Sequence, residues 1–238
     1  MEKLIEHDII KLRRVRKEVF IDLFSDVNSW GQFNKKLLSI AYSEIGINFG
    51  GGKYSSYSPA EEEIEGALPA INMFVGQSFE MLMEILYKVR PMDPDLGGIS
   101  NYRPGTTKTS IDNGVDAYGK NLNDEDIVLQ IKYKYNPESF LTNNKQHLSN
   151  MAVQGPLDFG VKGGFEGEAP AIKKYFVITS GKGLHRYTDE EYFRGHVYCI
   201  GIKTLRQKMS HISFWNQARE MVNKSISAYY GKKSLSYI

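Results

Sequence analysis

The ten-residue stretch DIVLQIKYKY, residues 126–135, constrains the fold more than any other part of the chain. Apolar or aromatic side chains stand at every second position, which is the period of a β-strand with one buried face. The residues of that face are Ile127, Leu129, Ile131, Tyr133 and Tyr135. The other face carries Gln130 and Lys132, and two interpretations are open: ordinary contact with solvent, or membership of a functional site.

A second strand pattern, NGVDAYGK at residues 113–120, precedes this stretch and is joined to it by the turn-forming segment NLNDED. The two patterns predict a β-hairpin. Asp116 is an acid inside the apolar pattern, and pairing of the strands would gather Asp116, Gln130 and Lys132 at one end of the hairpin. Because a half-buried lone charge costs several kcal/mol, a partner or a metal explains these side chains better. The plain alternative is a hairpin whose polar residues face solvent.

Residues 72–90, NMFVGQSFEMLMEILYKVR, have the clearest helical periodicity in the chain. An apolar stripe that includes Phe79, Leu82 and Leu86 predicts one buried face, and Pro91 predicts the end of the helix. Glu80 lies beside that stripe, close enough to its edge to point inward at a site. Glu84, one turn later, is expected to be in solvent.

The whole pattern predicts an α/β protein with a central mixed sheet flanked by helices. The other predicted helices cover residues 2–24 and 139–152 and begin near Ser29, Ser58 and His211. KKYFVITS and HVYCIGI predict buried strands, whereas PMDPDLGGISNYRPGT reads as irregular. We expect two parts, a helical extension over residues 1–70 and the main domain over residues 71–238.

Composition excludes several classes of protein. Of the 238 residues, 41% are hydrophobic and 24% are charged, and no window approaches the roughly 18 apolar residues that a membrane span requires. No secretory signal begins the sequence, so we expect a soluble, cytoplasmic protein without a membrane partner. Cys199 is the single cysteine, which excludes an internal disulfide and a thiolate zinc cluster within the chain.

The net charge of +2 does not by itself indicate a nucleic-acid-binding protein, so the distribution of charge matters more. One basic cluster, KLRRVRK, consists of Lys11, Arg13, Arg14, Arg16 and Lys17. It predicts either a solvated helix face or a surface that contacts phosphates. Lys182 and His185 follow the predicted strand KKYFVITS and are further candidates for contact with a substrate phosphate.

The residues at the end of the hairpin suit phosphodiester cleavage. This chemistry needs oxygen ligands for Mg²⁺, a cation that stabilises developing charge, and a water whose pKa the metal lowers. Asp116 and Gln130 offer oxygen atoms, Lys132 offers the cation, and Glu80 can supply a further carboxylate from its helix.

These motifs resemble the PD-(D/E)xK nuclease superfamily, and most closely its Mrr-type members, in which Gln occupies the second acidic position. The resemblance covers about residues 76–202. It places the first helix at GQSFEMLMEIL, the metal-binding Asp at GVDAYG, and the Gln-x-Lys motif at LQIKYK. The segment YFVITSGKGLHRYTDEEY resembles a later strand and loop of that subgroup, at Thr179, Ser180, Tyr187 and Thr188.

The resemblance implies a restriction-endonuclease-like fold and a DNA endonuclease that uses Mg²⁺, with Mn²⁺ as a substitute. It implies that Asp116, Glu80, Gln130 and the Ile131 carbonyl hold the metal, while Lys132 orients the attacking water or stabilises the transition state. DNA is then the partner, and cleavage of a duplex implies a homodimer. Asp112 is a second acid that competes with Asp116 for the metal-binding role.

Two other hypotheses stay open from the sequence. The neutral Gln130 and the long N-terminal region allow a nucleic-acid-binding or structural protein on the same fold that no longer cuts. Alternatively, the chain is an unrelated α/β enzyme whose hairpin imitates the motif.

Overall fold

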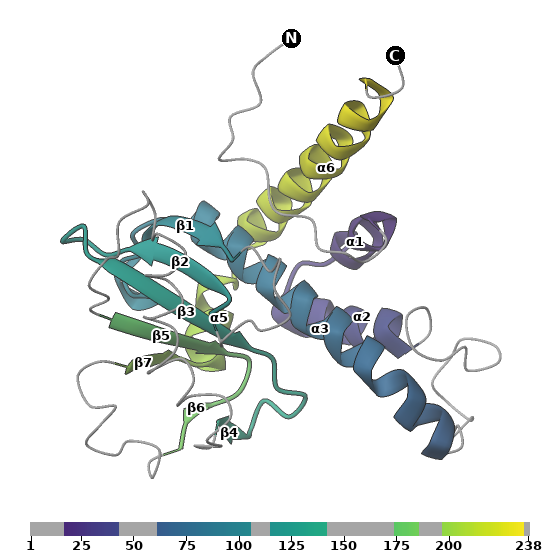
Figure 1. The fold of residues 1–238 in the computed structure, drawn as a ribbon, viewed down its shortest axis with the longest axis horizontal. Coiled ribbons are helices and arrows are strands. Elements are labelled where there is room, and N and C mark those ends of the chain that lie inside the picture. Colours follow the sequence, from purple (N-terminus) through teal and green to yellow (C-terminus); the bar gives the residue numbers. More distant parts are fainter. Residues whose placement is uncertain (1–16, 43–60, 106–114, 142–173, 186–196, 236–238) are drawn as a thin grey trace. The chain divides into compact units, whose positions relative to one another are not determined.

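The structure, a computed structural model, describes residues 17–42, 61–105, 115–141, 174–185 and 197–235 (Figure 1). The protein is mixed α/β, as the sequence predicts, with a five-stranded mixed sheet that helices precede and follow in the chain. It divides into two compact units, one formed by Met1–Ile85 with Met209–Ile238 and the other by Leu86–Lys208. The boundary that we expected after residue 70 falls inside a helix.

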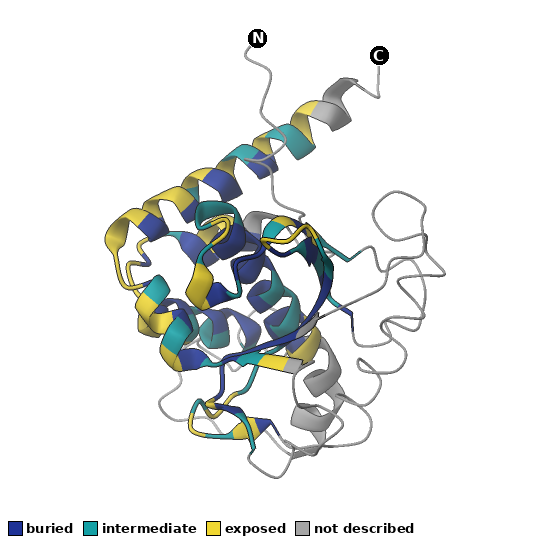
Figure 2. Ribbon diagram, turned by 90° about the vertical axis from the view of Figure 1, so that its left-hand side faces the viewer, coloured by how far each residue is buried: buried dark blue, intermediate teal, exposed yellow. Residues whose placement is uncertain are grey.

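The first unit is helical. Its helices are α1 (Lys17–Phe24), α2 (Trp30–Ile40), most of α3 (Glu61–Val89), and α6 (Ile212–Leu235). Ser29 caps α2 as predicted, because its side chain accepts a hydrogen bond from the Gln32 N–H at 3.3 Å. Along α6, buried and exposed residues alternate at helical spacing (Figure 2). An aromatic core joins distant parts of the sequence, and the ring centroids of Phe33 and Trp215 lie 5.9 Å apart.

Helix α3 differs from the prediction in two ways. It is a single helix of 29 residues, whereas the sequence predicted a short helix near Ser58 and a separate one over 72–90. Every residue from Met81 to Tyr87 is buried, and Glu84 is only 1% exposed, so the expectation that Glu84 is in solvent was wrong. An amphipathic pattern predicts one solvated face, but the segment 81–87 is buried on every side and has none.

The sheet belongs to the second unit and contains β1 (Ser100–Pro104), β2 (Ala117–Lys120), β3 (Asp126–Lys132), β5 (Lys174–Thr179) and β7 (Val197–Ile200). The strands are ordered β1-β2-β3-β5-β7. The first three pair antiparallel, and β3, β5 and β7 pair parallel. The predicted hairpin and both predicted later strands are therefore confirmed.

Strand β1 was missed because its sequence, SNYRP, is mostly polar. Only Tyr102 is buried among its five residues, and Pro104 ends it. Polar side chains and proline are typical of a strand at the edge of a sheet, where a period-two apolar pattern is absent. The rest of the unit contains a short 3₁₀ helix η3 (Pro94–Leu96), two short paired strands β4 (Phe140–Leu141) and β6 (Gly183–Leu184), and helix α5 (Ile202–Lys208).

Strand β3 is buried on both faces, which corrects the expectation of one solvated face. All five residues from Ile127 to Ile131 are buried, and Gln130 is 0% exposed. The strand lies in the middle of the sheet between antiparallel β2 and parallel β5, and such strands are covered on both sides. It ends at Lys132, three residues before the end of the alternating pattern.

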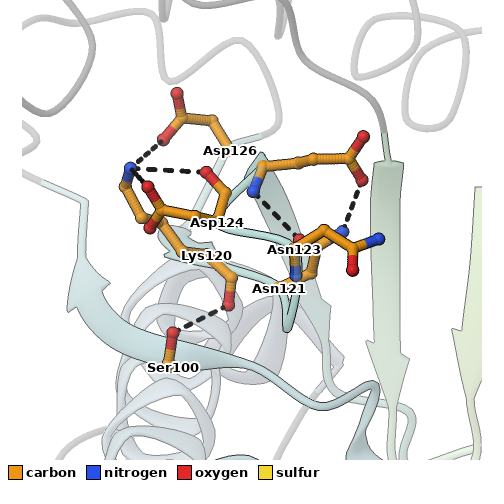
Figure 3. Close-up of polar contacts among 7 residues, drawn as sticks. Ser100, Lys120, Asn121, Asn123, Asp124 and Asp126 are labelled. Atoms are coloured by element: carbon orange, nitrogen blue, oxygen red, sulfur yellow. Dashed lines mark hydrogen bonds and ion pairs between the residues drawn. The ribbon is translucent and has the colours of Figure 1, made fainter.

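A network of side chains organises the turn between β2 and β3 (Figure 3). Asn121 is 7% exposed, and its Oδ1 accepts hydrogen bonds from the backbone N–H groups of Asn123 and Glu125, both at 2.9 Å. Lys120 Nζ lies 3.2 Å from Asp124 Oδ2. These contacts fix the turn and thereby the register that pairs Ala117 with Leu129 at the other end of the hairpin.

No helix in the part of the chain that the structure describes is long and apolar enough to cross a membrane.

Candidate functional site

Asp116 immediately precedes β2 and bonds to the backbone on both sides of Gln130. Its backbone N–H donates to the Leu129 carbonyl at 2.8 Å. Its side-chain Oδ2 accepts a hydrogen bond from the Ile131 N–H at 2.6 Å. The carboxylate is therefore held at the residue that separates Gln130 from Lys132.

Gln130 and Lys132 differ in burial although they share one face of β3. Side chains two residues apart on a strand point the same way, yet Gln130 is fully buried while Lys132, the last residue of the strand, is half-buried. Contact with solvent is thus excluded as the explanation for Gln130. Burying an amide without polar partners is unfavourable. The Gln130 side chain is therefore a structural or functional part of the interior and not a surface residue.

The N–H and the carbonyl of a strand residue point to the same side of the strand. The Ile131 carbonyl therefore lies on the same side of β3 as the Ile131 N–H, which donates to Asp116. The Asp116 carboxylate, the Ile131 carbonyl and the Gln130 side-chain carbonyl are all oxygen donors, the kind of ligand that Mg²⁺ prefers. By donor chemistry these residues fit the predicted metal. Within the described residues, no group of three or more His, Cys, Asp or Glu side chains is placed to hold a metal ion.

The parallel strands β3 and β5 end together, so residues that follow them are neighbours. Lys132 is paired in register with Thr179. The next residue, Ser180, is 1% exposed, and its Oγ accepts from the Lys134 N–H at 2.6 Å and donates to the Lys134 carbonyl at 3.1 Å. Thr179 and Ser180 thus anchor the chain that leaves Lys132.

Glu80 belongs to a different unit from the other three predicted catalytic residues. It is a partly exposed residue of α3 in the helical unit. Asp116, Gln130 and Lys132 belong to the sheet unit, and the structure brings these three together at one end of the hairpin.

Several predicted residues lie outside the described part of the chain. These are Lys11, Arg13, Arg14, Arg16, Asp112, Tyr187 and Thr188. Lys17 is the first residue of α1, but its side chain is likewise outside the description.

Lys182 and His185 lie beside residues that the sequence did not single out. Lys182 Nζ is 2.8 Å from Glu138 Oε2, and the hydrogen bond and charge of Lys182 lower the pKa of the Glu138 carboxyl. The His185 ring meets the Phe140 ring edge-on, with centroids 5.7 Å apart. The only sequence signal for Phe140 is an aromatic residue in a polar segment, and the sequence predicts a helix for that segment.

Comparison of the chain with protein-family models, with curated proteins and with solved structures found no match.

Proposed function

We propose that this protein is a Mg²⁺-dependent endonuclease that hydrolyses phosphodiester bonds in DNA. The observation that carries the proposal is the hydrogen bond that the Asp116 carboxylate accepts from the N–H of Ile131, the residue between Gln130 and Lys132 in the chain. The complete burial of Gln130 supports it, because a solvated strand face would leave this side chain exposed. The resemblance of the motifs to PD-(D/E)xK nucleases supplies the reaction class.

The metal would be held by the Asp116 carboxylate and the Gln130 and Ile131 carbonyls, and it would supply a Lewis acid and a water of lowered pKa. Asp116 is oriented for this role by its bond to the Ile131 N–H. Lys132 carries its ammonium group at the end of β3, where it donates hydrogen bonds to phosphate oxygens as they gain charge. Ser180 fixes the backbone that follows Lys132.

Nicking of supercoiled plasmid DNA in Mg²⁺ tests the proposal. Asp116→Asn keeps an acceptor for the Ile131 N–H and removes the charge, so it should fold normally and lose cleavage by about a hundredfold or more. Lys132→Met should do the same. Lys134→Met is the matched control, because Lys134 lies two residues beyond Lys132 and outside β3. Thermal unfolding followed by circular dichroism establishes that each variant is folded.

Full cleavage by both Asp116→Asn and Lys132→Met would overturn this assignment. Equal loss in Lys134→Met would show that general basicity, and not the position of Lys132, supports activity.

The neutral Gln130 favours one second candidate, a nucleic-acid-binding protein on the same fold that does not cut. Gln130→Glu separates the two. In an active nuclease this substitution keeps cleavage, since a carboxylate is also a ligand for Mg²⁺. The binding-only protein shows no nicking with Mg²⁺ or Mn²⁺, while its DNA affinity falls steeply as salt is raised.

A further inference from the structure

We propose that Phe140, Lys182 and His185 form a stacking platform for an unpaired nucleotide of single-stranded DNA. The three residues, named the platform from here on, lie beyond the ends of β3 and β5. The inference deepens the proposed function and rests on it for the identity of the nucleic acid. On this proposal, the DNA substrate has at least one unpaired base near the site of cleavage.

Backbone pairing holds the platform rigid. Strands β4 and β6 pair in parallel, with Phe140 opposite Gly183. The Lys182 N–H donates to the Ser139 carbonyl at 2.9 Å, and the His185 N–H donates to the Leu141 carbonyl at 2.9 Å. The ring and its two basic neighbours are therefore set on a fixed frame before any ligand binds, which lowers the entropic cost of binding.

Phe140 is 43% exposed in spite of its large apolar ring. Its neighbours are basic: Lys182 Nζ lies 5.8 Å from the ring centroid, and His185 meets the ring edge-on. An exposed aromatic ring beside a lysine is the combination that binds single strands, because the base stacks and the phosphate meets the charge. Paired bases in a duplex keep their faces stacked on one another and cannot use such a ring.

The platform follows the proposed catalytic residues along the chain. Residues 133–139 lead from Lys132 to β4, and Ser180 bonds to Lys134 along the way. Ligands of parallel sheets bind outside the carboxyl ends of the strands, and both Lys132 and the platform lie there. A strand whose phosphate reaches Lys132 would then extend a neighbouring nucleotide over Phe140.

A glycine permits this arrangement. A Cβ atom at Gly181 would lie 2.6 Å from the Ser139 carbonyl oxygen and 3.2 Å from Lys134 Cγ. Only glycine lets the segment after β5 approach the segment before β4 this closely.

Glu138 opposes the binding of DNA at the platform. Its carboxylate contacts Lys182 Nζ at 2.8 Å, which is where a phosphate oxygen would bind. A phosphate at this point competes with Glu138 for Lys182 and is repelled by its charge, so removal of this charge should strengthen DNA binding. A merely structural role for the ion pair predicts no such gain.

Fluorescence anisotropy of labelled oligothymidine, with the full chain in EDTA, measures binding without cleavage. We expect the wild type to bind the single strand more tightly than a duplex of equal length. Phe140→Leu should raise Kd for the single strand roughly fivefold or more through loss of stacking, while Phe140→Trp should retain the affinity. Glu138→Gln should lower Kd, and Lys182→Gln should reduce the dependence of log Kd on log salt by about 0.7.

Wild-type affinity in both Phe140→Leu and Glu138→Gln would overturn the platform. Should Phe140→Leu fail to fold, Glu138→Gln decides alone, because it leaves the ring untouched. The two proposals fail separately. A protein that nicks plasmid DNA but shows no effect of these substitutions is a nuclease without the platform. One that shows the expected effects and never nicks retains the platform and loses the proposed function.

Discussion

The carboxylate of Asp116 accepts a hydrogen bond from the backbone N–H of Ile131, with 2.6 Å between Oδ2 and N. Asp116 lies just before the first residue of β2, whereas Ile131 is still within β3. The side chain of Asp116 therefore supplies the acceptor that a backbone carbonyl would supply between two paired strands. It gives Asp116 a structural role in addition to the catalytic role that we propose. Substitutions at this position must be chosen to separate the two.

Asp116→Ala and Asp116→Asn should differ in stability. Alanine leaves the N–H of Ile131, a residue that is 5% exposed, without its acceptor, which costs about 1–3 kcal/mol. Asparagine retains an oxygen acceptor and should cost less. Urea unfolding measures both. Equal stability of the two variants would mean that the bond contributes nothing, whereas cleavage should be lost in both.

The turn of the hairpin should depend on Asn121 far more than on Asn123. Asn121 Oδ1 accepts two backbone hydrogen bonds, and its Nδ2 donates to Glu125 Oε2 at 2.7 Å. Asn121→Ala should therefore lower the unfolding free energy by about 1–3 kcal/mol. Asn123→Ala, two residues away, is the control, since the Asn123 side chain is exposed. A similar loss in both variants would contradict the assigned role.

The hairpin could be predicted from the sequence because its signals are local. A period of two, a turn rich in Asn and Asp, and one acid inside an apolar run were enough to pair Asp116 with the Gln130 region. The burial of Gln130 could not be predicted in this way. It depends on β5, which lies more than forty residues further along the chain, and a parallel neighbour leaves no mark within the strand that it covers.

Two other features were missed for similar reasons. Strand β1 is a polar edge strand in which Tyr102 alone is buried. Its sequence carries no strand pattern, and its extended conformation depends on pairing with β2. The sequence predicts a helix around Phe140, because a two-residue strand is too short to show a period of two. Both are set by contacts distant in sequence.

Ser180→Ala should destabilise the strand end that carries Lys132. Ser180 is buried, and its hydroxyl bonds to both backbone groups of Lys134, so its removal should cost about 1–3 kcal/mol. Ser139→Ala is the matched control, because the Ser139 hydroxyl bonds to the Asn136 carbonyl at an exposed site. Thermal unfolding measures the stability of both variants. An equal loss of stability in the two would show that the hydrogen bonds between Ser180 and Lys134 have no special role.

Alanine should have opposite effects at two glycines. Gly181→Ala brings Cβ to 2.6 Å from the Ser139 carbonyl oxygen, so overpacking should cost about 1–3 kcal/mol. At Gly76, inside α3, a Cβ meets nothing within 4 Å, and alanine should gain about 0.5–1 kcal/mol from its higher helix propensity. Chemical denaturation gives both values. A stable Gly181→Ala variant would show that the two segments move apart easily.

Cys199 should react slowly as a thiol and should make stability fall at alkaline pH. Burial raises its pKa from 9.0 to about 11. Since only the thiolate attacks, alkylation by iodoacetamide at pH 8 should be roughly tenfold slower in the native protein than after unfolding, even allowing for the greater nucleophilicity of a more basic thiolate.

The sign of the pH effect follows from the same pKa. The folded state holds the thiol proton more tightly than the unfolded state, so the stabilisation is complete below pH 9.0 and is lost as the pH rises through about 11. Cys199→Ala should lack this part of the alkaline decline, which urea unfolding between pH 8 and pH 11 would reveal by comparison with the wild type. Rapid alkylation of the native protein would show instead that Cys199 is accessible as thiolate, and parallel pH profiles would show that its ionisation is not coupled to folding.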